Sequence, residues 1–158
     1  MNIYLIRHGE AEKSSIGLKD FDRQLTHQGK IKLTQTAENW KNYLDTFDFI
    51  ISSPFLRAVQ TAEIIKEVFN YSGKIVVDKK LAPGCKTESI IELASSLDGK
   101  EIAFIGHQPD LSEHTSNLIS IKGANIEFKK GAIAKISFEN KIRLGKGTLE
   151  FLVPSVKK

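Results

Sequence analysis

Near its start the chain carries the stretch Ile3-Tyr4-Leu5-Ile6-Arg7-His8-Gly9-Glu10, which is the strongest indication of its fold. Its apolar run fits a strand that is buried on both faces, and it stops abruptly on an arginine, a histidine and a glycine. In an open α/β sheet, ligands bind in the crevice beyond the carboxyl ends of the strands, where Arg7 and His8 would emerge. Gly9 lets the backbone turn tightly or come close to an anion. An isolated Arg-His-Gly triplet is more often a solvated strand end, so the functional interpretation depends on the rest of the chain.

Length and composition favour one compact domain. The 158 residues, of which 41% are hydrophobic, are expected to form a single domain over residues 1–158. Cys85 is the only cysteine, which excludes an internal disulfide and favours a reducing compartment, most simply the cytoplasm. The apolar start is too short for a signal peptide or a membrane span, so we expect a soluble protein with no membrane partner.

The net charge of +4 is unevenly distributed. Residues 122–158 carry nine Lys or Arg and three acidic residues, whereas residues 1–121 carry fourteen basic and sixteen acidic residues. Such a surface could steer an acidic or phosphorylated partner, although a solvated lysine-rich face is the commoner case. Because no basic tract is dense, we expect no nucleic acid among the partners.

Apolar periodicity predicts an α/β fold. Strands and amphipathic helices alternate through about Leu118, which is typical of βαβ units and predicts a three-layer α/β/α sandwich with a mostly parallel sheet. Beyond the first strand, the expected strands are 47–51, 75–77 and 102–105, and the expected helices are 26–44, 55–69 and 87–97. Asp110 and Glu113 resemble a capping pair that opens one more helix. The runs 132–138 and 148–153 predict an antiparallel hairpin at the edge of the sheet.

Three of the expected strands end in polar residues with matching chemistry. Arg7 and His8 follow the first strand, Arg57 lies a few residues after the second, and His107 follows the fourth. Because parallel strands end at one edge of the sheet, two guanidinium groups and two imidazoles should converge there and form an anion site. Guanidinium groups match the oxygens of a phosphoryl group. Arginines alone would suffice to hold phosphate, so the two histidines indicate covalent chemistry in which an imidazole attacks phosphorus.

Several motifs together resemble the histidine phosphatase superfamily, which is also called the phosphoglycerate mutase-like family. They occur in the family's order and are Leu5-Ile6-Arg7-His8-Gly9-Glu10, Leu25-Thr26-His27-Gln28-Gly29, Ser53-Pro54-Phe55-Leu56-Arg57-Ala58 with Gln60-Thr61-Ala62, and Gly106-His107-Gln108-Pro109. The short length, the Ser-Pro-Phe-Leu-Arg-Ala motif and the absence of long insertions are most similar to the SixA-type phosphohistidine phosphatase branch. The resemblance implies a phosphoglycerate mutase-like fold.

The resemblance also implies roles for particular residues. His8 would be the nucleophile that accepts the phosphoryl group, Arg7 and Arg57 would clamp it, and His107 would be a further donor to its oxygens. Two neighbouring arginines should keep His8 neutral, whereas His107 would be more useful protonated. Gly9 and Gln108 complete the expected substrate-binding set. This chemistry needs neither a metal nor another cofactor.

The general acid is the one role that the resemblance does not fill clearly. Larger members of the family supply a glutamate from the region after the third strand, and residues 81–92 hold no clear match. Glu88 is the candidate by position and Glu10 the candidate beside the first motif. A third possibility is that no acid is needed, because an imidazole protonated on its distal nitrogen leaves readily.

Other residues that could carry chemistry are expected to be structural. His27 and His114 lie within expected helices, and Trp40 belongs to an apolar helix face. Cys85 has no evident partner that would make it a nucleophile. The pattern His-Glu-x-x-His of zinc enzymes is absent, so no metal site is expected.

Three functions fit the sequence. The favoured one is a hydrolase that removes phosphate from a histidine on a signalling or phosphotransfer protein. The others are a phosphatase of a small phosphoester metabolite and a catalytically silent module that binds phosphoproteins. Two histidines argue against the silent module. The missing acid, and the absence of long insertions that would roof the pocket over a small molecule, favour the first function over the second. The partner and the oligomeric state stay open.

Overall fold

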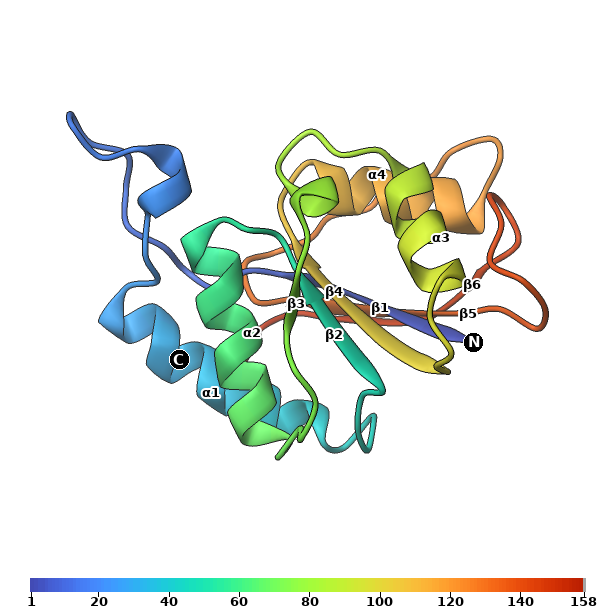
Figure 1. Ribbon diagram of the computed structural model, residues 1–158, viewed down its shortest axis with the longest axis horizontal. Coiled ribbons are helices and arrows are strands. Elements are labelled where there is room, and N and C mark those ends of the chain that lie inside the picture. The colour runs from blue at the N-terminus through green and yellow to red at the C-terminus, as the bar shows by residue number, and fades with distance from the viewer. Residues whose placement is uncertain (158) are drawn as a thin grey trace.

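The computed structural model describes residues 1–157 and contains a six-stranded sheet with helices on both faces (Figure 1). In chain order the elements are β1 (Asn2–Arg7), the 3-10 turn η1 (Asp20–Asp22), α1 (His27–Trp40), β2 (Phe49–Ser52), α2 (Leu56–Val68), β3 (Val76–Val77), the 3-10 turn η2 (Lys79–Leu81), α3 (Thr87–Ser95), β4 (Glu101–Gly106), α4 (Asp110–Ile119), β5 (Ile133–Ser137) and β6 (Thr148–Val153).

The strand order is β3-β2-β4-β1-β5-β6. β1, β2, β3 and β4 run parallel to their neighbours, whereas β5 pairs antiparallel with β1 and β6 antiparallel with β5. The predicted mostly parallel sheet with a C-terminal hairpin at its edge is therefore confirmed. β2, β4 and β1 are the three strands that were expected to be followed by site residues, and they lie next to one another in the middle of the sheet.

Two apolar clusters cover the two faces of the sheet. α1 and α2 pack on one face, and α3 and α4 pack on the other (Figure 1). Trp40 is fully buried in the first cluster, as expected of a core residue. The central strands β1 and β4 contribute side chains to both clusters, which explains their unbroken apolar sequences.

Two helices end earlier than the sequence predicts. α1 begins after Thr26, whose Oγ1 accepts a hydrogen bond from the Gly29 N–H, but it ends at Trp40 rather than at Leu44. The Asn42 amide donates to the carbonyl of Asn39 at 3.0 Å and competes with the helix there. α3 ends at Ser95 rather than Leu97, where the Ser96 hydroxyl donates to the Leu93 carbonyl in the same way.

The predicted capping pair at the start of α4 is wrong. Asp110 is the first residue of this helix, and its carboxylate accepts a hydrogen bond from the Gly84 N–H at 2.8 Å instead of capping α4. The Gln108 side chain takes the capping role, since its Oε1 accepts from the Ser112 N–H at 3.1 Å. Asp110 thus ties the loop before α3 to the start of α4.

Over residues 1–157, none of the helices combines the length and the apolar sequence that crossing a membrane would require.

Candidate active site

The carboxyl ends of β1, β2 and β4 bring the predicted arginines and histidines together. The imidazole rings of His8 and His107 lie with their centroids 5.3 Å apart. Arg57, in the first turn of α2, donates from Nε to Nε2 of His8 at 3.2 Å. Parallel pairing of β4 with both of its neighbours therefore creates the convergence that the strand ends predicted.

His8 is buried in a defined tautomer. Its Nδ1 lies 2.7 Å from the carbonyl oxygen of Gly9. Because a carbonyl can only accept, Nδ1 carries the proton, and Nε2 carries none and accepts the hydrogen bond from Arg57. The pKa of His8 is lowered to about 4, mainly by burial and also by the charges of Arg57 and Arg7, while the hydrogen bond to Gly9 opposes this shift. His8 is therefore a neutral imidazole at neutral pH.

Arg57 is held in place from three sides. Its Nη1 donates to the carbonyl oxygen of Asp20 at 2.8 Å, and its Nη2 pairs with the Asp20 carboxylate at 3.3 Å. The guanidinium carbon lies 5.1 Å from the centroid of the Phe55 ring. Because the side chain is also buried, its Nε is aimed at His8 with little freedom to move.

His107 is buried between Ser53 and the other site residues. Its Nε2 lies 2.7 Å from the Ser53 hydroxyl oxygen, whereas its Nδ1 is buried with no hydrogen-bond partner among residues 1–157. The pKa of His107 is lowered to about 3, mainly by burial and also by the neighbouring His8 and Arg57. A buried imidazole beside cations stays neutral, so His107 is neutral in the free protein. The expectation of a protonated His107 concerns the state with a phosphoryl group bound, and it stays a prediction.

Arg7 reaches the site from the end of β1. Its Nη1 donates to the carbonyl oxygen of Phe128 at 2.8 Å, and its Nε is buried without a partner in the described chain. Burial lowers the pKa of Arg7, although a guanidinium group remains charged at neutral pH. One side of its fork is thus anchored to the backbone.

Two residues beside this cluster were not predicted from the sequence. The carboxylate of Asp20 bridges Arg57 and Arg23, and its bond to Arg23 is 2.8 Å long. Hydrogen bonding to Arg23 is the main reason why the pKa of Asp20 is lowered. Asp20 and Arg23 belong to an irregular segment, so no periodic pattern pointed to them.

Gly9 and Gln108, which were expected to bind substrate, make hydrogen bonds within the scaffold. The Gly9 N–H donates to the Thr61 hydroxyl at 3.1 Å, and the Gln108 Nε2 donates to the Ser112 hydroxyl at 2.6 Å. Both residues lie next to a site histidine in sequence. The hydrogen bond of Gly9 nevertheless links the end of β1 to α2, and that of Gln108 stabilises the start of α4.

The two glutamates proposed as general acid make no hydrogen bond to His8 or His107. Glu88 is exposed in the first turn of α3, where it makes no hydrogen bond to another described residue. Glu10 is also exposed and lines a hollow beside Arg7. Among the residues that the structure covers, Asp20 is the only one whose carboxylate bonds to any of the four predicted site residues.

The other residues with reactive side chains take structural positions. His27 is exposed, and His114 is buried with its Nδ1 3.0 Å from the Thr87 hydroxyl. Cys85 does have a neighbour that the sequence did not reveal, since its Sγ lies 3.3 Å from Nε2 of His114. Burial raises the pKa of Cys85 to about 11, so it remains a thiol and not a nucleophile.

Comparison with known proteins identifies the family. The histidine phosphatase superfamily (branch 1) matches residues 3–82. An uncharacterized protein of Picosynechococcus sp. is 30% identical over 137 residues, which cover 84% of this chain and 82% of that protein. A phosphohistidine phosphatase SixA homolog of Haemophilus influenzae is 27% identical over 149 residues, 88% of this chain and 89% of that protein.

Solved structures show the same fold. The protein histidine phosphatase SixA in complex with tungstate superposes with a TM-score of 0.86 at 24% identity, covering 98% of this chain and 97% of that chain. The chain belongs to the histidine phosphatase superfamily, branch 1, and is a phosphatase. Within that superfamily it is similar to proteins of the SixA type.

Proposed function

We propose that this phosphatase works through a phosphohistidine on His8 and removes phosphate from histidine side chains of a signalling or phosphotransfer protein. The observation that carries the proposal is the state of His8. Its Nδ1 proton is held by the Gly9 carbonyl, its Nε2 lone pair is free of a proton, and its pKa of about 4 keeps it so. A neutral imidazole in this state is a competent nucleophile toward phosphorus.

In the first step, the Nε2 lone pair of His8 attacks phosphorus in line with the bond that breaks. The bond between phosphorus and the substrate nitrogen breaks, and its electron pair leaves with that nitrogen. Before the attack, the phosphoryl oxygens draw the Arg57 Nε–H away from Nε2, which frees the lone pair. Arg7 and the unpartnered Nδ1 of His107 supply further contacts to the oxygens.

In the second step, a water molecule attacks the phosphoryl group on His8. The bond from Nε2 to phosphorus breaks, the electron pair returns to His8, and the water proton passes to solvent as inorganic phosphate leaves. A bound phosphoryl dianion also opposes the burial that lowers the pKa of His107, because an adjacent negative charge favours an imidazolium. His107 can then stabilise the charge on the transferring group.

The lack of a placed acid supports a phosphohistidine substrate. The carboxylate of Asp20 is bonded directly to Arg57 of the site. Arg23 and Arg57 hold this carboxylate ionised, so it is a poor proton donor. An alkoxide leaving group would need such a donor, whereas an imidazole whose distal nitrogen is protonated leaves as a neutral molecule. The name of the Haemophilus influenzae relative, a phosphohistidine phosphatase SixA homolog, agrees with this choice.

The test compares two substrates and two variants. The wild-type protein should release phosphate rapidly from a phosphohistidine-bearing protein and slowly from an aryl phosphate. The substitution His8→Ala should lower both rates on the order of a thousandfold or more, because the nucleophile is lost. His27→Ala, at an exposed histidine outside the site, is the matched control and should leave both rates unchanged.

Trapping the intermediate separates the remaining alternatives. Acid-labile, base-stable phosphate on the wild-type chain that disappears in His8→Ala would support the covalent route. Preferential hydrolysis of the aryl phosphate would favour the small-phosphoester phosphatase. Binding of a phosphoprotein without phosphate release would favour the silent module.

A further inference from the structure

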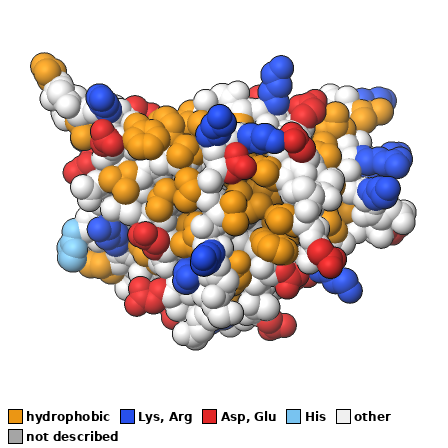
Figure 2. Space-filling view, in the orientation of Figure 1, with side chains coloured by type: hydrophobic (Ala, Val, Ile, Leu, Met, Phe, Trp, Pro, Cys, Tyr) orange, Lys and Arg blue, Asp and Glu red, His pale blue; other side chains and the backbone are white. Residues whose placement is uncertain are grey.

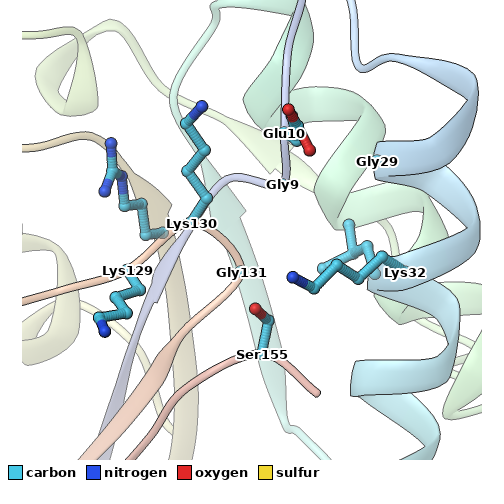
Figure 3. A pocket seen from close by; sticks show the side chains of 10 residues that line it. Gly9, Glu10, Gly29, Lys32, Lys129, Lys130, Gly131 and Ser155 are labelled. Atoms are coloured by element: carbon cyan, nitrogen blue, oxygen red, sulfur yellow. The ribbon is translucent and has the colours of Figure 1, made fainter. Parts of the chain in front are cut away.

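A basic hollow adjoins the histidine site on the side of β5 (Figure 3). It has a volume of about 310 Å³ and is lined by residues that include Arg7, Glu10, Lys32, Lys129, Lys130 and Ser155. In Figure 3, Lys32 extends from α1 toward Gly131, and the side chain of Ser155 lies across from it. Arg7 therefore contributes to the histidine site and to this hollow.

The strand order determines where the hollow lies. His107 and His8 follow β4 and β1, while Lys129 and Lys130 precede β5, which is the next strand along the sheet. Neighbouring strands are about 4.8 Å apart, so the lysines lie roughly one to two strand spacings, about 5–10 Å, beyond His8. The hollow therefore lies on the β5 side of His8, and Arg7 lines it.

The lysine-bearing loop is fixed to the backbone of the nucleophile. The Gly131 N–H donates to the carbonyl oxygens of both Arg7 and His8, at 3.2 and 3.1 Å, and the Arg7 N–H donates to Ala132. Gly131 has a φ of 71°, which an L side chain rarely adopts. Lys129 and Lys130 are thus held at a constant place relative to His8.

The hollow carries uncompensated positive charge. Lys32, Lys129 and Lys130 form no ion pair within residues 1–157, and Glu10 is the only carboxylate that lines the hollow. Lys129 and Lys130 are exposed. Unpaired ammonium groups on flexible stems suit separate carboxylates better than they suit one planar anion, which arginine forks would bind.

We propose that this hollow binds acidic side chains of the protein partner that lie next to its phosphorylated histidine. The proposal rests on the proposed function and specifies the chemistry of the partner. On a helix, residues three or four apart have Cβ atoms about 5–6 Å apart, so an acidic residue one turn from a phosphohistidine would reach the lysines. Complementary charge at such a rim would act mainly on encounter and affinity.

A second surface feature favours a protein over a small anion. Ile16 is fully exposed and Phe21 is 46% exposed, and the Phe21 ring lies 5.1 Å from Phe55, whose ring lies 5.3 Å from His107. The segment before η1 projects from the body of the molecule, and its outer end is hydrophobic (Figure 1, Figure 2). An exposed apolar group near the site, such as Phe21, contributes nothing to a small charged ligand but can pack against a protein.

The experiment uses two phosphohistidine peptides of helical sequence and an aryl phosphate. One peptide carries Asp and Glu around the phosphohistidine, and the other carries Asn and Gln at the same positions. The variant Lys32→Glu/Lys129→Glu/Lys130→Glu should raise KM for the acidic peptide about tenfold or more and leave its kcat unchanged. For the amide peptide and for the aryl phosphate, KM and kcat of the same variant should stay within about twofold of the wild-type values. Retained turnover of these substrates also shows that the variant folds.

The matched control is Lys141→Glu/Arg143→Glu/Lys146→Glu. These residues line a different hollow, beside the end of β5 that is remote from His8, and their substitution should leave all three substrates unaffected. An unchanged KM for the acidic peptide in the first variant overturns the inference and leaves the proposed function intact. Failure of the wild-type protein to hydrolyse either peptide, with aryl phosphate turnover retained, overturns both. Binding of a small bisphosphate is measured in addition. If the first variant binds the bisphosphate more weakly than the wild type does and its KM for the acidic peptide is unchanged, the hollow is assigned to small anions instead.

Discussion

Arg57 donates from Nε to Nε2 of His8 at 3.2 Å, so the side chain proposed to clamp the phosphoryl oxygens covers the proposed nucleophilic atom in the free protein. The same guanidinium is held through its other nitrogens by Asp20. Substrate must therefore displace one hydrogen bond of Arg57 while the other contacts keep the side chain in position.

The substitution Arg57→Lys should lower kcat/KM about a hundredfold, because an ammonium keeps the charge but loses the fork that serves both His8 and Asp20. Single-turnover rates on a phosphohistidine protein measure this loss. Arg143→Lys, at an arginine outside the site, is the control and should behave as wild type. Full activity of Arg57→Lys would show that charge alone is sufficient.

Stability should fall in mildly acidic solution because of the buried histidines. The pKa of His8 is about 4 in the folded chain, against about 6.5 for an unfolded histidine. Between these values the unfolded chain binds more protons, so the free energy of unfolding decreases as the pH falls and the penalty is absent above about pH 6.5. For His8 the loss between pH 7 and pH 5 is about 2 kcal/mol.

Urea unfolding at pH 7 and pH 5 measures this difference. His8→Asn should flatten the pH dependence, whereas His27→Asn, at an exposed position, should keep the wild-type slope. The pKa of His107, about 3, predicts the same direction for His107→Asn. An identical slope in wild type and His8→Asn would contradict the neutral state assigned to His8.

The substitution Asp20→Asn tests whether Asp20 positions Arg57 or donates a proton. A positioning role predicts a loss of about tenfold in kcat/KM that is the same for phosphate esters with good and poor leaving groups, because Arg57 and Arg23 lose their shared anion. An acid role predicts a loss that grows with the pKa of the leaving group. Rates on a series of aryl phosphates distinguish the two outcomes.

Glu88→Gln should change the hydrolysis of phosphohistidine by less than about twofold, since Glu88 is exposed on α3 and makes no hydrogen bond to the other residues described. Glu10→Gln serves as the parallel test of the second candidate. A drop in kcat of tenfold or more in either variant would identify the general acid that the sequence left open.

Much of the fold and the core of the site followed from local patterns. Apolar runs that end in Arg7-His8 and in Gly106-His107 predict parallel strands and a shared edge, because burial on both faces and abrupt polar ends are both visible in the sequence. The length of the helix that ends at Trp40 was overestimated. The helical spacing of apolar residues continues to the buried Leu44, although the backbone leaves the helix after Trp40.

The electrostatic state of the site could not be predicted in the same way. Asp20 meets Arg57 across 37 positions from an irregular segment, and no periodicity marks such a contact. The neutral form of His107 depends on how deeply it is buried beside other cations, which is a property of the assembled fold. The position of Asp110 was misjudged for a related reason, since its partner is a distant Gly84 N–H rather than its own helix.

The hydrogen bond between His8 Nδ1 and the Gly9 carbonyl makes the orientation of the proposed nucleophile an internal property of two adjacent residues. In a serine protease triad, by contrast, a separate carboxylate sets the tautomer of the histidine. In this chain the Arg-His-Gly turn is sufficient to leave Nε2 unprotonated, and the hydrogen bond from Arg57 Nε agrees with that tautomer. Surrounding loops can therefore diverge and redirect the enzyme to new substrates while the chemical identity of the attacking atom is inherited with the turn itself.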